Sequence, residues 1–205
     1  MATTGLLLCS FLIIHLFGNL FLYGGPELFN TYVERLASIK PLIRVIEVIL
    51  ALIFLFHIIN SLWLTLSNRK ANPVKYEVNR AQDNSSFFSR YMGITGSIVF
   101  IFLAVHLSTF WYRFQIDHDG GQFYRIVTGD AVGFNNPYIT GLYILAMILL
   151  GFHLRHGFQS AFQTFGLRYN KYGKLIEAIA VLFWFAIPLG FVLIPIYFGL
   201  LKGGF

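Results

Sequence analysis

Charged residues are scarce in this chain of 205 residues. Asp, Glu, Lys and Arg together make up 12% of it, whereas apolar residues make up 57%. Soluble globular domains carry about 25% charged residues, and the mean hydropathy of this chain, +0.67, is well above that of such domains. The composition therefore excludes an ordinary soluble domain and predicts a single integral membrane domain over residues 1–205.

Cysteine is almost absent, which excludes several kinds of site. Cys9 is the only cysteine, so it cannot form an internal disulfide. Because it lies in an apolar run, we expect it to be buried and to pack as a small hydrophobic residue. The chain lacks the Cys-x-x-Cys-His motif of covalent haem attachment, the several cysteines of an iron–sulfur cluster and any dinucleotide-binding fingerprint. The net charge of +6 comes largely from loops, and nothing in it suggests nucleic acid.

Long apolar runs are what the sequence has in abundance. Each of five runs approaches the roughly 20 residues that cross a bilayer core. They are predicted at 5–23, 42–67, 90–113, 138–165 and 175–200. The fold class is therefore predicted to be all-α, an integral membrane bundle of five transmembrane helices. The first run lacks a basic n-region and carries a histidine, so we expect a retained helix and not a cleaved signal peptide.

Two prolines lie inside the fifth run, and basic residues are concentrated in two of the loops between runs. Pro188 and Pro195 fall inside the fifth run, where we expect kinks and no break, because neighbouring helices can satisfy the freed carbonyls. The loops after the second and fourth runs are rich in Lys and Arg, whereas the loop over 115–136 contains three Asp. The positive-inside rule then predicts a cytoplasmic N-terminus, two cytoplasmic basic loops and an external C-terminus.

Four histidines lie deep inside four different runs: His15, His57, His106 and His153. Ionisable side chains are rare within membrane spans and usually mark function. His15 and His106 lie 8 and 7 residues from the outer ends of their runs, whereas His57 and His153 each lie 16 residues from theirs. A difference of about 8 residues corresponds to ~12 Å along a helix. The histidines therefore form an outer and an inner pair.

Two depth-matched pairs are the pattern expected of two haems with two axial ligands each, because imidazole is the usual protein ligand of haem iron and bundle cores present ligands from facing helices. We predict that His15 and His106 hold an outer haem and that His57 and His153 hold an inner one. The alternative is four histidines satisfied by contacts between helices. His156, three residues after His153, competes with it as a ligand.

Other polar residues in the runs have two readings each. Arg155 and His156 suit haem propionates or a partner subunit, and the alternative is polar contact between helices. A quinone site beside these two residues is the runner-up to a quinone site at Glu47. Glu47, near the depth of the outer haem, suits proton exchange with a quinone; the alternative is an ion pair with Arg44 one turn away. Gly93 and Gly96 let the third run approach a porphyrin or another helix closely.

Several segments resemble the dihaem cytochrome b subunit of succinate dehydrogenases and fumarate reductases. The segments are Ile14-His15-Leu16-Phe17-Gly18-Asn19, Phe56-His57, Ser89-Arg90-Tyr91-Met92 leading to His106, and Gly151-Phe152-His153-Leu154-Arg155-His156-Gly157-Phe158-Gln159-Ser160-Ala161-Phe162-Gln163. Each motif is short, but their order and spacing cover nearly the whole chain. The four axial ligands of the family map onto His15, His57, His106 and His153.

The resemblance implies a function. The chain would be the membrane anchor of a succinate:quinone oxidoreductase in a bacterial cytoplasmic membrane, with two haem b groups and a quinone, menaquinone, as substrate. Its partners would be a flavoprotein subunit and an iron–sulfur subunit, the latter nearer to the haem of His57 and His153. Some family members carry a glutamate two residues before the fourth-run ligand, and here Gly151 stands there.

Two alternatives remain open from the sequence. The chain could be the cytochrome b subunit of a membrane-bound hydrogenase or formate dehydrogenase, which also uses few helices and histidine ligands. It could also be a haem-free proton-coupled transporter, with its histidines acting as proton relays.

Overall fold

The computed structural model describes residues 1–71, 83, 85–116, 122–129, 131–167 and 172–203. Within these residues the secondary structure is helical throughout, and five helical segments are long and apolar enough to cross a membrane: Ala2–Gly24, Lys40–Ala71, Met92–Gln115, Pro137–Thr164 and Gly173–Leu201. The five predicted spans are confirmed as helices of that length and character. The largest difference is at the end of the second span, predicted at residue 67 and observed at Ala71.

The spans are built from the following elements. The first is α1 (Ala2–Leu20) with the 3-10 turn η1 (Phe21–Gly24), and the second is α3 (Lys40–Ala71). The third follows the short α5 (Phe87–Arg90) and comprises α6 (Met92–His106), η2 (Leu107–Trp111) and α7 (Tyr112–Ile116). The fourth is α9 (Pro137–Thr164), and the fifth comprises α10 (Gly173–Val181), η3 (Leu182–Ala186), α11 (Ile187–Pro195) and η4 (Ile196–Leu201).

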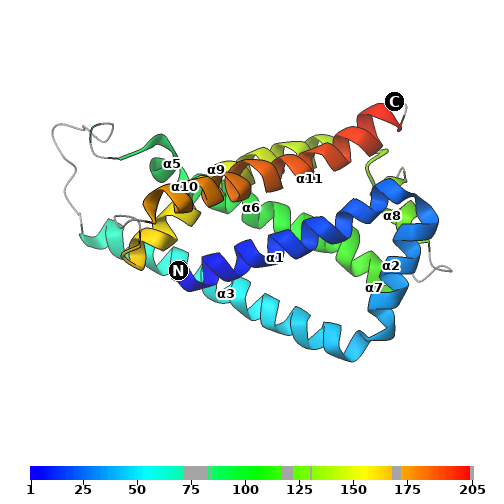
Figure 1. Ribbon diagram of the computed structural model, residues 1–205, viewed down its shortest axis with the longest axis horizontal. Coiled ribbons are helices and arrows are strands. Elements are labelled where there is room, and N and C mark those ends of the chain that lie inside the picture. The colour runs from blue at the N-terminus through cyan, green and yellow to red at the C-terminus, as the bar shows by residue number, and fades with distance from the viewer. Residues whose placement is uncertain (72–82, 84, 117–121, 130, 168–171, 204–205) are drawn as a thin grey trace.

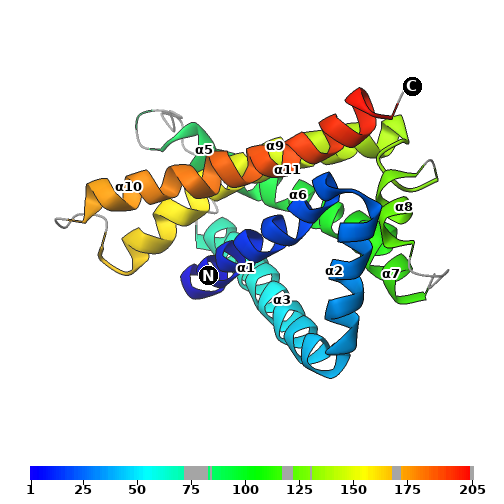
Figure 2. The same ribbon diagram turned by 45° about the vertical axis from the view of Figure 1, so that its right-hand side comes forward.

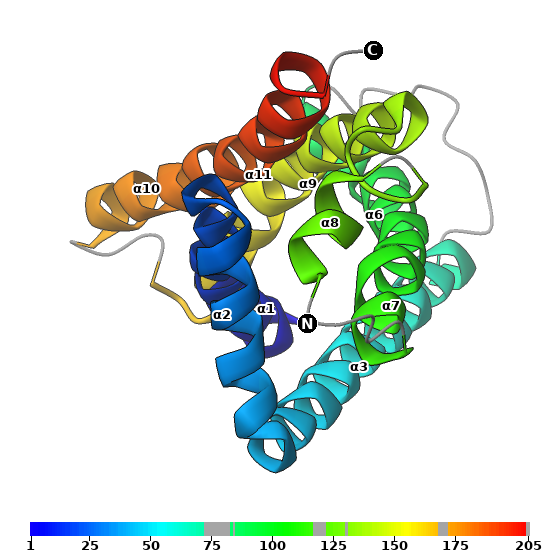
Figure 3. The ribbon, with the colours of Figure 1, turned by 90° about the vertical axis from the view of Figure 1, so that its right-hand side faces the viewer.

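The two ends of the bundle differ in what they carry (Figure 1). The N-terminus, α5, α10 and the end of α9 lie at one end, which we call the inner end after its predicted cytoplasmic side. The C-terminus, α2 (Pro26–Ser38), α7 and α8 (Phe123–Thr128) lie at the other, which we call the outer end. Figure 3 views the molecule from this outer end, with α2, α7 and α8 in front.

Helices α2 and α8 were not predicted. Gly25, at φ 89°, turns the chain after η1, and Pro26 starts α2 at a position where its missing N–H is no loss. The two helices pack against each other, with Phe29 and Phe123 buried and the backbone N–H of Tyr124 donating to Asn30 Oδ1 at 2.8 Å. They therefore cover the outer end of the bundle instead of crossing the membrane.

The spans contribute unequally to the core. Helix α9 lies at the centre, packs against α1, α6, α11 and η3, and buries eight residues along its length, among them Tyr143, Ala146 and Met147. Helix α3 buries no residue and packs mainly against α1 and α2, so it lies at the edge of the bundle, as Figures 1 and 2 show. The second span is therefore the one whose position depends least on packing within this chain.

The prolines of the fifth span leave the helix continuous, as predicted. Pro188 follows the π-type turn η3, and Pro195 directly precedes the π-type turn η4. Proline cannot donate to the carbonyl four residues earlier, so Pro188 frees the carbonyl of Trp184. The wider turns absorb the altered hydrogen-bond register without ending the helix.

Candidate functional site

The outer histidine pair joins the first and third spans. His15 on α1 and His106 at the end of α6 have ring centroids 5.7 Å apart, with the two planes at 89°. Aromatic side chains enclose the pair: Phe11 stacks on His15 at 5.1 Å, and Phe191 lies 5.6 Å from it. The helices therefore bring together the two histidines that the depth count matched.

Tyr143 of α9 orients the ring of His106. Its hydroxyl and His106 Nδ1 share a hydrogen bond of 3.2 Å. Tyr143 is buried and packs edge-on against Phe102 and Phe134, so its position is fixed by the core. A hydrogen bond at one ring nitrogen sets the tautomer and leaves the other nitrogen for a metal, which is how proteins prepare a ligating histidine.

The inner histidine pair joins the second and fourth spans. His57 on α3 and His153 on α9 have ring centroids 6.5 Å apart, with their planes at 67°. His57 Nδ1 shares a hydrogen bond of 3.1 Å with Thr4 Oγ1. His153 Nδ1 is buried and has no hydrogen-bond partner among the described residues. A buried ring nitrogen without a hydrogen-bond partner is costly, which makes His153 a candidate functional residue.

Glycines adjoin the inner pair. A Cβ atom on Gly96 would lie 3.2 Å from His153 Cε1, and one on Gly5 would lie 3.6 Å from His57 Cε1. Gly93, by contrast, has no heavy atom within 4 Å of its Cβ position. Of the two third-span glycines, only Gly96 lets a histidine approach the helix backbone.

The spacing within both pairs fits two axial ligands on one iron. Two imidazoles that bind a metal from opposite sides, through bonds of about 2 Å each, have ring centroids about 6 Å apart. The observed values of 5.7 and 6.5 Å bracket this spacing. Among the described residues no three His, Cys, Asp or Glu side chains gather, but a haem iron needs only two protein ligands because the porphyrin supplies the other four. Haem ligation by these residues stays a prediction.

His156 and Arg155 lie in different surroundings from His153. It is the ring of His153 that faces His57, whereas His156 lines a polar cavity. The guanidinium of Arg155 lies 4.0 Å above the ring of Phe88 and 5.0 Å above that of Trp184. Arg155 therefore ties α9 to α5 and to η3 through cation–π contacts.

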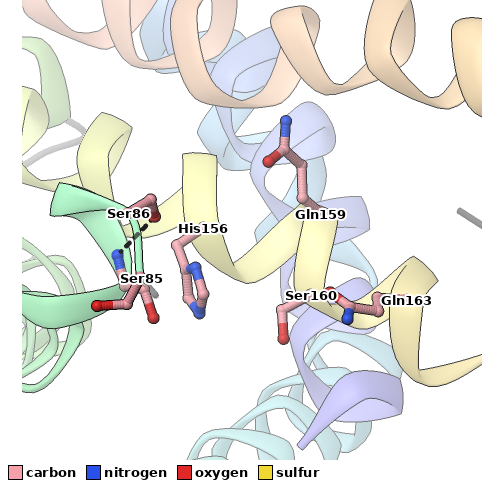
Figure 4. Close-up of a pocket in the computed structure, with 7 residues that line it drawn as sticks. Ser85, Ser86, His156, Gln159, Ser160 and Gln163 are labelled. Carbon is pink, nitrogen blue, oxygen red and sulfur yellow. Dashed lines mark hydrogen bonds between the residues drawn. The ribbon is translucent and has the colours of Figure 1, made fainter. Parts of the chain in front are cut away.

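The polar cavity near His156 lies between α5 and the last two turns of α9. We call it the serine pocket. Its volume is about 310 Å³, and its lining is hydroxyl, amide and imidazole: Ser85, Ser86, Ser89, His156, Gln159, Ser160 and Gln163. Figure 4 shows His156 between Ser85 and Ser86, which directly precede α5, and Ser160 of α9. The sequence indicated a polar end of the fourth span but gave no sign that the serines before the third span face it.

Glu47 and Arg44 belong to a larger polar cluster at the outer end. Arg44 Nη1 and Glu47 Oε2 form an ion pair of 2.6 Å. Trp111 Nε1 donates to the other carboxylate oxygen of Glu47 at 3.0 Å, and Arg44 also donates to Gln115 Oε1. We call these four residues the Glu47 cluster. An open surface depression of about 280 Å³ adjoins Arg44 on α3 and is otherwise lined by the exposed side chains of Val45, Val48 and Ile49.

Trp111 and Gln115 were not predicted as partners of Glu47. Trp111 is the last residue of η2, the π-type turn that begins directly after His106. The extra residue in such a turn rotates everything after it by part of a helical turn relative to a regular α-helix, and π-turns recur at functional sites. The turn therefore connects a predicted haem ligand with a donor to Glu47 on another span.

Gly151 is required by packing. A Cβ atom there would lie 2.9 Å from the carbonyl oxygen of Trp184 and 3.6 Å from Pro188 Cβ. This carbonyl is the one that Pro188 deprives of its helical donor, so α9 approaches the fifth span at this proline. A glutamate at position 151 would not fit this contact, and the proton pathway associated with that residue has no counterpart at this position.

Comparison of the chain with family models, curated proteins and solved structures finds no match.

Proposed function

We propose that this chain is the haem b-containing membrane anchor of a succinate:quinone oxidoreductase, a succinate dehydrogenase or fumarate reductase. The observation that carries the proposal is the pairing of four intramembrane histidines from four different spans, at two levels of the bundle. Contacts between helices alone account for one such pair, but they give no reason for a second pair with a similar ring spacing.

The two pairs would hold two haem b groups, each of which, when bound, supplies reversible one-electron transfer. Tyr143 and Thr4 orient His106 and His57 through their Nδ1 atoms. Gly96 leaves room for His153 beside the third span. Aromatic residues pack around His15 and limit the access of water to the outer pair. These residues set the position, solvent access and ligand geometry on which the redox potentials of the two sites depend.

The Glu47 cluster is the proposed place of quinone exchange. A quinone needs an apolar wall for its ring and a polar group that moves protons to its oxygens. The depression beside Arg44 offers Val45, Val48 and Ile49 as such a wall. The carboxylate of Glu47, held by Arg44 and Trp111, is the proton-exchanging group of the same region.

The catalytic flavin and the iron–sulfur clusters would reside on partner subunits, a flavoprotein and an iron–sulfur protein. The sequence itself offers one cysteine and no dinucleotide fingerprint for them. The inner end of the bundle, where the second and fourth spans end, is the proposed docking side, facing the cytoplasm of a bacterium, because the sequence that follows each of these spans is basic. Electrons would then enter next to His57 and His153 and leave toward a quinone, menaquinone, at the outer end.

A visible absorption spectrum of the protein purified from membranes, with a haem-to-chain ratio, tests this proposal. We expect two non-covalently bound b-type haems per chain and their reduction by succinate. One haem per chain would overturn the four-ligand assignment, and none would favour a haem-free transporter. Reduction by hydrogen or formate instead of succinate would assign the chain to the cytochrome b subunit of a hydrogenase or formate dehydrogenase.

A further inference from the structure

The serine pocket lies where the spans meet the membrane surface. Ser89 precedes the first residue of the third span, Met92, by three positions, and Ser160 precedes the last residue of the fourth span, Thr164, by four. Phe87 and Phe88 flank this region on α5, and Phe87 is 53% exposed. Tyr91, which follows α5, is 44% exposed, and amphipathic tyrosine side chains favour the depth of the lipid headgroups, so we expect the pocket to open at headgroup level.

The chemistry of the lining suits an oxyanion. Hydroxyl, amide and imidazole groups all donate hydrogen bonds, and none of the described residues that line the pocket carries a carboxylate. Two arginines flank it: Arg90 donates to the carbonyl of Ser85 at 2.5 Å, and Arg155 packs on Phe88. Asp83, four residues before the start of α5, is exposed and is not part of the lining. The region is therefore rich in donors and positive in charge.

A quinone is a poor occupant of this pocket. Its ring needs flat apolar walls, and none of the lining side chains is apolar. The depression beside Arg44 has the opposite character, with three aliphatic residues and one cation. The volume of about 310 Å³ lies at the small end of ligand sites, which run from roughly 300 to 1,000 Å³, and suits a single headgroup.

We infer that the serine pocket binds the phosphate group of a membrane phospholipid, whose acyl chains would follow the outer surface of the third and fourth spans. Ser89 and Ser160 donate to the phosphate oxygens from the two sides of the pocket, and Arg90 and Arg155 supply the positive field. The inference is independent of the proposed haems and quinone site, because it uses only the ends of α5 and α9.

Native mass spectrometry of the protein purified in mild detergent tests the inference. The probes are phosphatidylglycerol, diacylglycerol with the same acyl chains, and inorganic phosphate. We expect one phosphatidylglycerol to be retained per chain and diacylglycerol to be released. The double variant Ser89→Ala/Ser160→Ala should weaken retention by roughly tenfold or more, because two hydrogen bonds to a charged group are lost.

The matched control is Ser97→Ala/Ser108→Ala. Both serines lie in the third span, and both donate to the backbone of their own helix, to Gly93 and Val105 at 2.8 Å each. Equal loss of lipid in this control, unchanged retention in the pocket variant, or equal retention of diacylglycerol would each overturn the inference. Binding of inorganic phosphate with no phospholipid retained would overturn the lipid as its source, and loss of haem with retained lipid would assign the pocket to the cofactor.

Discussion

The two histidine pairs differ in what surrounds them. The outer pair lies among aromatic rings, and its hydrogen-bonding partner, Tyr143, is buried in the core. The inner pair has Gly5 and Gly96 as neighbours, and His57 shares a hydrogen bond with the half-buried Thr4. Among the described residues, the buried Nδ1 of His153 has no hydrogen-bond partner. One of its members, His57, lies on α3, the span that buries no residue. The outer pair is thus fixed by packing within the chain, whereas the inner pair leaves more of its geometry to whatever binds there.

The largest expected effect separates the two pairs outright. His57→Ala and His153→Ala should deplete one spectral component, while His15→Ala and His106→Ala should deplete the other, because each variant would remove one of the two proposed protein ligands of a haem iron. Reduced-minus-oxidised spectra and redox titrations of the four purified variants measure this. Variants of the inner pair should also block electron entry from the partner subunits, whereas variants of the outer pair should leave reduction of the inner haem intact.

His156, the competing candidate for the ligand on the fourth span, provides the control for this test. His156→Ala should keep both components, because the ring that faces His57 is that of His153. Loss of the inner component in His156→Ala, with its retention in His153→Ala, would exchange the two assignments. If instead His15→Ala and His57→Ala depleted the same component, the division into an outer and an inner pair would be wrong.

The next prediction concerns Glu47, the acid proposed to exchange protons with a quinone at the outer end of the bundle. Glu47→Gln keeps the shape of the side chain and an oxygen for Trp111 but removes the exchangeable carboxylate proton. Quinone-linked turnover should fall by roughly 100-fold or more, the usual contribution of a general acid or base, while haem content stays the same. Glu34→Gln, on the exposed surface of α2 at the same end, is the matched control. Unchanged turnover in Glu47→Gln would reduce Glu47 to the structural partner of Arg44.

The depth count from sequence anticipated which histidines meet because the rise of a helix is constant and does not depend on its neighbours. The other contacts of the Glu47 cluster could not be predicted in this way, because they depend on how neighbouring helices pack. Trp111 lies 64 residues from Glu47, and Gln115 lies 71 residues from Arg44. The π-type turn η2, which ends at Trp111, also rotates the end of the third span relative to its beginning. Hydropathy reports that a helix crosses the membrane but not which way its side chains point.

Helices α2 and α8 escaped prediction because neither produces a long apolar run. Helix α2 has 13 residues with charges at both ends, and α8 has only six residues. Their stability comes from tertiary contact, Phe29 and Phe123 in particular, and from the Asn30–Tyr124 hydrogen bond. Contacts of this kind join segments far apart in the sequence, which residue patterns within one segment do not reveal.

A third effect should act on the inner pair alone. Gly96→Val places methyl groups where even a Cβ lies 3.2 Å from His153 Cε1, and overpacking of this kind costs about 1–3 kcal/mol. We expect the inner component to be lost or shifted and the outer one to be unchanged. Gly93→Val carries the same change in helix propensity three residues earlier, with no heavy atom within 4 Å of the new Cβ. Equal effects of the two variants on the inner component would attribute the loss to helix propensity and not to the histidine.

The smallest expected effect comes from the partners of the histidine rings. Tyr143→Phe removes the hydrogen bond to His106 but keeps the ring that packs against Phe102 and Phe134. Loss of such a partner weakens metal binding by about 10–100-fold, so haem retention and midpoint potential of the outer component should change. Thr4→Val removes the corresponding bond to His57 and should change the inner component by less.

The reason for this difference lies in what replaces each lost bond. The hydroxyl of Tyr143 belongs to a buried residue in an aromatic core, where no water can take its place, whereas Thr4 lies half-buried in the first turns of α1. Tyr138→Phe, on the same helix and 86% exposed, controls for the first variant, and Thr3→Val, exposed beside Thr4, controls for the second. A larger effect of Thr4→Val than of Tyr143→Phe, measured as haem lost during stepwise dialysis, would contradict the view that packing within the chain fixes the outer pair more firmly than the inner one.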